Sequence, residues 1–86
     1  MTSKAPKTFL IFVTNKYGNT GYIRYKSTVS SIGKIHYEII LTEKVKDASR
    51  FVSGENTKNK ARKLKERFKF RDVEVIDETI KRRYVI

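Results

Sequence analysis

The chain contains no cysteine, one histidine and one proline among its 86 residues. Without cysteine it cannot be a disulfide-stapled scaffold, a cysteine-ligated zinc finger, an iron–sulfur protein or an enzyme with a thiol nucleophile. A single histidine provides no cluster of imidazole ligands for a metal ion. From these absences we expect no metal site and no cofactor.

Long apolar segments are also missing. The longest apolar run covers residues 9–13, whereas a membrane-spanning helix needs about 20 such residues. Residues 1–7 carry charge, but no long apolar region or cleavage site follows them, which excludes a signal peptide. We expect residues 1–7 to be a disordered leader and residues 8–86 to be one domain of a cytoplasmic protein that does not bind membranes.

Acidic residues are scarce as well. The chain has 9 Asp and Glu against 20 Lys and Arg, which gives a net charge of +11 and a pI of about 10.1. Such an excess lowers stability through self-repulsion and is typical of proteins whose partner is a polyanion. The charge therefore favours nucleic acid as the partner, with a solvated basic surface that binds no anion as the alternative.

Three strands are expected in the first half of the chain. Residues 8–14 are a continuous β-branched and aromatic run, and residues 22–27 alternate after a turn rich in glycine and asparagine. Residues 35–42 alternate most regularly, which predicts one buried face composed of Ile35, Tyr37, Ile39 and Leu41.

After residue 42 the spacing of apolar residues changes from the alternation of a strand to the period of a helix. We expect a short helix over residues 43–52, capped by Thr42 and stopped at Gly54, and a second helix from residue 56 or 57 to about residue 68. The second helix has an apolar stripe at i, i+3 and i+7, and it should end before Phe70. Residues 73–75 predict a fourth strand, and residues 79–86 are its continuation, a fifth strand or a tail. The core is expected to include Phe9, Ile11, Ile39, Leu41, Leu64 and Phe68.

The order β-β-β-α-α-β predicts an α+β fold. The most economical arrangement is a small two-layer sandwich, with an antiparallel sheet of four to five strands and two helices on one face. The alternative is a small barrel with the helices as a lid.

Residues 55–71 include eight basic and two acidic residues, too few acids for the pairs that normally relieve like charge on a helix. This segment is predicted to bind a phosphate backbone, although lysine stems along the core edge of a solvated helix are the alternative. Helical geometry sorts its basic residues into one ridge of Lys58, Arg62, Lys65 and Lys69, a second ridge of Lys60, Arg67 and Arg71, and Lys63 outside both.

Two smaller features extend this hypothesis. Lys81, Arg82 and Arg83 either lengthen the phosphate-binding surface or protect a strand edge from pairing. Tyr22, Arg24 and Lys26 share one strand face, which is either a minor stacking platform or an ordinary strand surface. We expect this face to lie opposite the helices.

The segment that joins the third strand to the helices carries a Thr-x-x-x-x-x-Ala-x-x-Phe pattern at Thr42, Ala48 and Phe51. In this pattern and in its cysteine-free, lysine- and isoleucine-rich composition, the chain resembles small uncharacterised α+β proteins encoded by phages and mobile elements of low-GC bacteria. The resemblance implies a viral type of protein and no particular site.

The sequence favours a non-enzymatic module that binds DNA or RNA through its basic helix. No catalytic residues are expected, since His36 and Glu38 are only strand neighbours without a pocket. One alternative is a small phage-type inhibitor or adaptor that docks on an acidic host protein. Another is a subunit that docks into a larger complex through residues 84–86.

Overall fold

The computed structural model describes residues 7–86, so the expected disordered leader lies outside the described residues except for Lys7, which is exposed. The described elements are β1 (Phe9–Thr14), β2 (Thr20–Val29), β3 (Ile35–Thr42), the 3-10 turn η1 (Val45–Asp47), α1 (Gly54–Phe68), β4 (Asp72–Asp77) and β5 (Arg82–Val85).

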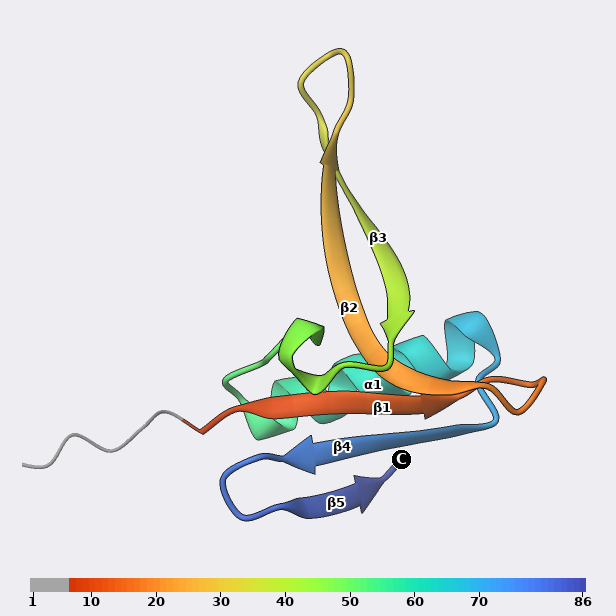
Figure 1. The fold of residues 1–86 in the computed structure, drawn as a ribbon, viewed down its shortest axis with the longest axis vertical. Helices are drawn as coiled ribbons and strands as arrows, with labels where there is room; N and C mark the ends of the chain where they lie inside the picture. The colour runs from red at the N-terminus through yellow and green to blue at the C-terminus, as the bar shows by residue number, and fades with distance from the viewer. Residues whose placement is uncertain (1–6) are drawn as a thin grey trace, which may run out of the picture.

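All five strands form one antiparallel sheet in the order β3-β2-β1-β4-β5, and α1 covers one face of it (Figure 1). The α+β class and the antiparallel sheet are therefore confirmed. The expected pair of helices and the order β-β-β-α-α-β are wrong, because η1 is a single turn and a fifth strand follows β4. The sheet ends at β3 and β5 and is not closed into a barrel.

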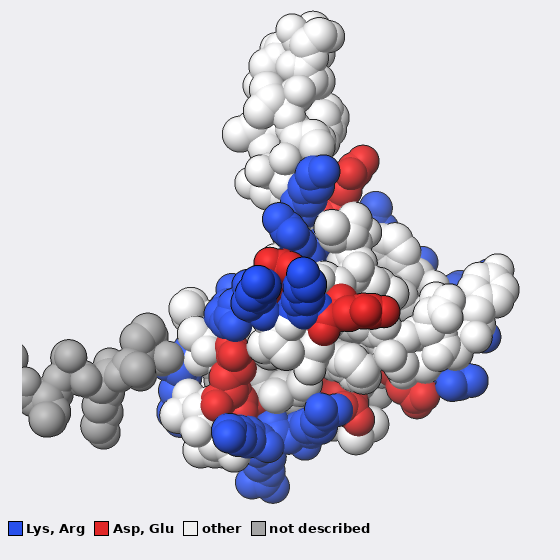
Figure 2. Space-filling view, viewed as in Figure 1, with Lys and Arg blue, Asp and Glu red and all other residues white. Residues whose placement is uncertain are grey.

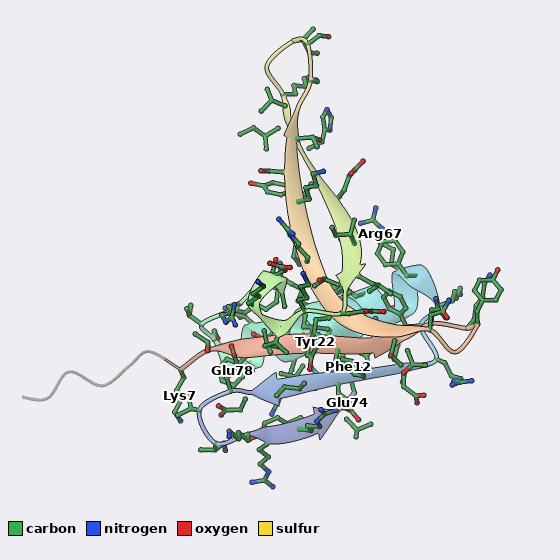
Figure 3. All side chains as sticks on the ribbon, in the orientation of Figure 1. Lys7, Phe12, Tyr22, Arg67, Glu74 and Glu78 are labelled. Atoms are coloured by element: carbon green, nitrogen blue, oxygen red, sulfur yellow. The ribbon has the colours of Figure 1, made fainter. Side chains whose placement is uncertain are left out.

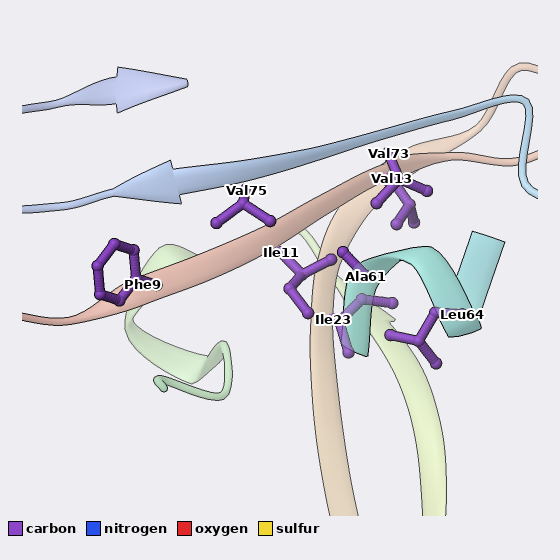
Figure 4. Packing of buried hydrophobic residues seen from close by; sticks show 8 residues of the cluster. All are labelled: Phe9, Ile11, Val13, Ile23, Ala61, Leu64, Val73 and Val75. Atoms are coloured by element: carbon purple, nitrogen blue, oxygen red, sulfur yellow. The ribbon is translucent and has the colours of Figure 1, made fainter. Parts of the chain in front are cut away.

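The core lies between α1 and the central strands (Figure 4). It consists of Phe9, Ile11, Val13, Ile23, Val73, Val75, Ala61 and Leu64. Of the residues expected to be buried, Ile39 packs against this cluster only in part, while Leu41 is 37% and Phe68 43% exposed. The prediction for Leu41 and Phe68 is wrong. The helix α1 packs mainly on β4 and β1, so it does not cover Leu41 on β3, and Phe68 is the last residue of α1.

A short extended segment separates β2 from β1. The two strands pair only near the β1–β2 turn. Farther along, Phe51 exchanges backbone hydrogen bonds of 2.8 and 3.0 Å with Phe9, and the Ser49 amide donates to the Ile23 carbonyl at 3.1 Å. The Ser49 hydroxyl then accepts from the Tyr25 amide at 2.8 Å. Residues 49–51 therefore occupy the position next to β1 that β2 would otherwise take. As a result, β2 and β3 leave the sheet together as a two-stranded arm, residues 25–39 (Figure 1).

The same segment explains why residues 43–52 do not form the expected helix. Residues 49–51 are extended in order to pair with Phe9, and the guanidinium of Arg50 donates to the carbonyl oxygens of Val45 and Lys46 at the short turn. Gly54 does not stop a helix but begins α1, where an added Cβ would lie 3.0 Å from the Phe9 ring.

The bounds of α1 differ from the prediction at one end only. Its N-cap is Ser53, whose hydroxyl accepts from the Asn56 amide, and not residue 56 or 57. At the other end α1 stops at Phe68, and Lys69 takes a left-handed conformation with φ of 57°. The predicted end before Phe70 is therefore confirmed.

Candidate functional site

The basic residues of α1 have no acidic partners among the described residues. Three ion pairs occur there, and they join Arg50 to Glu78, Arg71 to Asp72 and Arg83 to Glu74. None of them involves α1, which carries Lys58, Lys60, Arg62, Lys63, Lys65 and Arg67. Six cations on one helix repel each other, so this surface is electrostatically suited to an anion.

One side of α1 packs its basic residues against the C-terminal strand. The Lys58 ammonium lies 4.1 Å from the centre of the Tyr84 ring, and Lys65 Nζ donates to the Ile86 carbonyl oxygen at 2.8 Å. Both side chains are half-buried. Arg62 donates to Asn59 within the helix at 2.7 Å. Lys58 and Lys65 therefore follow the alternative interpretation, in which their stems cover the edge of the core.

The other side of α1 faces the arm. Lys60, Lys63 and Arg67 line a hollow of about 420 Å³ together with Tyr25 and Ile39 of the arm. Figure 3 shows Arg67 extending from α1 toward β3. These three residues are spaced at i, i+3 and i+7, which places them on one face of the helix.

Three details of the predicted ridges are wrong. Lys63, expected outside both ridges, lies between Lys60 and Arg67. Arg71 belongs to neither, because α1 has ended before it and its guanidinium lies 3.5 Å from Asp72. Lys69 is exposed at the helix end in the left-handed conformation, so it does not continue a ridge.

A second hollow of about 390 Å³ adjoins the first and shares Tyr25 and Lys60 with it. Its lining adds the aromatic rings of Tyr37 and Phe51 and the side chain of Arg50. No acidic side chain lines either hollow. We call the angle between the arm and α1 the inner corner, formed by Tyr25, Tyr37, Ile39, Lys60, Lys63 and Arg67.

Tyr25 lies between the two hollows. Its ring meets the Phe51 ring edge to face at 5.9 Å, and the Lys60 ammonium lies 4.9 Å from its centre. Burial raises the pKa of the Tyr25 phenol, and the Arg67 guanidinium partly offsets this rise. The phenol is therefore neutral at physiological pH and adds no negative charge to the inner corner.

The face formed by Tyr22, Arg24 and Lys26 lies on the other side of the sheet. Tyr22 packs edge to face on Phe12 at 5.1 Å, away from α1, as the strand alternation predicts. Lys26 lies opposite Glu38 in the β2–β3 register. In Figure 2 this face mixes Lys and Arg with Asp and Glu, so it is a less uniform anion-binding surface than the inner corner.

The basic residues near the C-terminus do not form one patch. Arg83 pairs with Glu74 at 2.9 Å and lies 5.6 Å from the centre of the Phe12 ring, on the face of Tyr22. Arg82 lies 5.4 Å from the centre of the Tyr84 ring, and Lys81 occupies the turn before β5. Arg82 and Arg83 stand on β5, one of the two edge strands of the sheet, where charge discourages pairing with another strand.

Sequence reasoning missed Tyr37 and Arg50 as members of a site. It assigned the face of β3 that carries Tyr37 and Ile39 to the core. In the structure this face does lie on the side of α1, but Tyr37 is exposed and lines the second hollow. The signal in the sequence that could have indicated this site was the aromatic face of residues 35–41 together with Lys60, Lys63 and Arg67, which recur at helical spacing.

The described residues contain neither a candidate metal centre nor a candidate membrane-spanning helix. In residues 7–86 no three His, Asp or Glu side chains are grouped to hold a metal ion, and no helix there has the length and apolarity to cross a bilayer. Comparison with protein-family models, with curated proteins and with solved structures gives no significant match.

Proposed function

We propose that the protein is a non-enzymatic nucleic-acid-binding module whose inner corner holds the phosphate backbone. The observation that carries the proposal is the convergence of Lys60, Lys63 and Arg67 on a hollow without acidic side chains. Such a surface attracts a polyanion over a distance of about a Debye length and releases counterions from it on binding. DNA and RNA both meet this requirement.

The remaining basic residues have supporting roles. Lys58 and Lys65 contact β5 and the chain end, and Arg83 pairs with Glu74, so part of their charge serves the fold. Arg62, Lys69 and Lys81 are exposed and contribute mainly to the long-range field that draws the ligand in.

A second candidate function is an inhibitor or adaptor that docks on an acidic protein. The observation in its favour is the outer part of the arm, where Val29, Ile32 and Ile35 are 70%, 76% and 61% exposed. Protein interfaces combine such an apolar centre with a polar rim. A protein ligand would use the arm as its main contact, whereas nucleic acid would use α1.

The test compares two variants with the same loss of charge. Lys60→Gln, Lys63→Gln and Arg67→Gln together remove the cations of the inner corner, while Arg62→Gln, Lys69→Gln and Lys81→Gln together remove three exposed cations elsewhere. Binding of a fluorescent oligonucleotide is measured by anisotropy at several salt concentrations.

We expect the inner-corner variant to lose affinity and to reduce the slope of log K against log salt by about 2–3, because about three phosphate contacts disappear. The control variant should change the slope by less than about 1. Equal losses in both variants would contradict the assignment to the inner corner. Failure of the unmodified protein to bind any oligonucleotide at low salt would refute the function itself.

A further inference from the structure

We infer that the ligand of the inner corner is a single-stranded nucleic acid, with an unpaired base stacked on Tyr37. This inference rests on the proposed function and names its substrate class. It comes from the position of Tyr37, which is 68% exposed yet lines the same hollow as Tyr25, Phe51 and Lys60.

Tyr37 differs from the other two rings of the second hollow, Tyr25 and Phe51. Tyr25 and Phe51 pack on each other, and both belong to the partly buried residues around the core. Tyr37 faces Ser27 across the arm, so no bulky cross-strand neighbour competes for its ring. An exposed ring beside a cationic helix is the combination by which single strands are held, since bases stack on aromatic faces while cations follow the phosphates.

The order of these groups along the inner corner also fits a single strand. Lys60 lines both hollows, Lys63 and Arg67 line only the one beneath Ile39, and Tyr37 lines only the other. Phosphates bound at Lys63 and Arg67 would therefore leave the next base near Tyr37. Each hollow has the volume of a small-ligand pocket, about 300–1,000 Å³.

A duplex fits this surface less well. Its bases are closed in the stack, so a ring on the arm cannot reach their faces. The arm is a two-stranded ribbon, and a major groove can admit such a ribbon. In the groove, however, the arm would lie between two phosphate backbones and would need cations to contact them. Among residues 27–37 only Lys34, in the turn at the end of the arm, carries a formal charge, and the face of that end seen in Figure 2 shows no Lys, Arg, Asp or Glu.

A second copy of the chain is a less suitable occupant of the apolar arm face. Each copy has a net charge of +11, and a partner seated at the inner corner would meet three cations without acidic counterparts. Nucleic acid neutralises this charge, and a second copy increases it.

The experiment uses the absence of tryptophan from the chain. Tyr37→Trp introduces one fluorescent reporter at the stacking position, and Tyr17→Trp introduces it at an equally exposed position, 77%, in the turn at the other end of β2. Each variant is titrated with oligo(dT) of about 12 nucleotides and with a duplex of similar length.

Stacking should quench the fluorescence of the Tyr37→Trp variant on addition of oligo(dT) and leave the Tyr17→Trp variant nearly unchanged. Tyr37→Ala should weaken oligo(dT) binding about 5- to 150-fold, the range that corresponds to one base–aromatic stack. It should leave duplex binding unaltered, as should Tyr17→Ala for both ligands. Circular dichroism of each variant checks that the fold is retained.

Three results would overturn the inference. Equal binding of duplex and oligo(dT), salt-dependent and without quenching, would exclude stacking but retain the proposed function. Absence of any binding by the unmodified protein would remove both. Emission of the Tyr37→Trp variant that depends on protein concentration without oligonucleotide would show that a second copy covers the arm face.

Discussion

Leu64→Ala tests the orientation of α1, on which the inner corner depends. Leu64 is only 4% exposed and belongs to the cluster between α1 and the central strands. Replacing a buried leucine by alanine costs about 2–5 kcal/mol, with the larger values at sites that leave a closed cavity. Leu64 also lines the open hollow of about 420 Å³, so the space left would merge with it. We therefore expect a loss of about 2–3 kcal/mol in the free energy of unfolding, near the lower end of that range.

The stability lost in Leu64→Ala is a large part of the total free energy of unfolding, which is about 4–12 kcal/mol for a domain of this size. It should lower Tm by about 8–24 °C. Urea unfolding followed by circular dichroism measures it, and Leu41→Ala provides a control because Leu41 is 37% exposed. The control should lose about 1.3–2 kcal/mol, because Leu41 buries about two thirds as much of its surface as Leu64 does. If both variants lost the same amount, the helix orientation would be wrong, and with it the placement of Lys60, Lys63 and Arg67.

Two further predictions concern the fold around the inner corner. Gly54→Ala should lower the free energy of unfolding by about 0.5–2 kcal/mol. The new Cβ would lie 3.0 Å from the buried Phe9 ring, and overpacking of about 1–3 kcal/mol exceeds a helix-propensity gain that is below about 1 kcal/mol at the first residue of α1. Thermal unfolding measures this, and an unchanged or higher Tm would contradict the close contact. Tyr25→Phe should reduce the loss of stability above pH 10, because the raised pKa of Tyr25 keeps its proton bound in the folded state while the unfolded state releases it. Urea midpoints of both proteins at pH 9 and pH 11 provide the comparison, and parallel changes would refute the role of Tyr25.

Local pattern was sufficient to predict most of the elements. Alternation identified β2, β3 and β4 because each side chain of a strand faces opposite to the next, and a continuous β-branched and aromatic run identified β1, whereas the pattern of residues 79–86 is compatible with a continuation of β4, a fifth strand or a tail. The position of Phe70 relative to the apolar stripe located the end of α1. Alternation also placed Tyr22 and Tyr25 on opposite faces. These features depend on residues that are close in the sequence.

The errors arose where distant segments meet. Alternation shows that Tyr37, Ile39 and Leu41 share a face, but whether that face is covered depends on the path of α1 over β1 and β4. The spacing of residues 45–52 fits a helix, yet pairing with Phe9 holds residues 49–51 extended. That same pairing turns the arm away from the sheet, so the inner corner was not predictable from either of its segments alone.

The most direct test of nucleic-acid binding at the inner corner is a chemical-shift titration with oligo(dT) at two salt concentrations. Binding at the inner corner should give the largest shifts at Tyr25, Tyr37 and residues 60–67, with those of the basic residues weakening at high salt. Shifts centred on Tyr22, Arg24 and Lys26 would place the ligand on the opposite face of the sheet. Either that pattern or shifts confined to the β5 side of α1 would contradict binding at the inner corner.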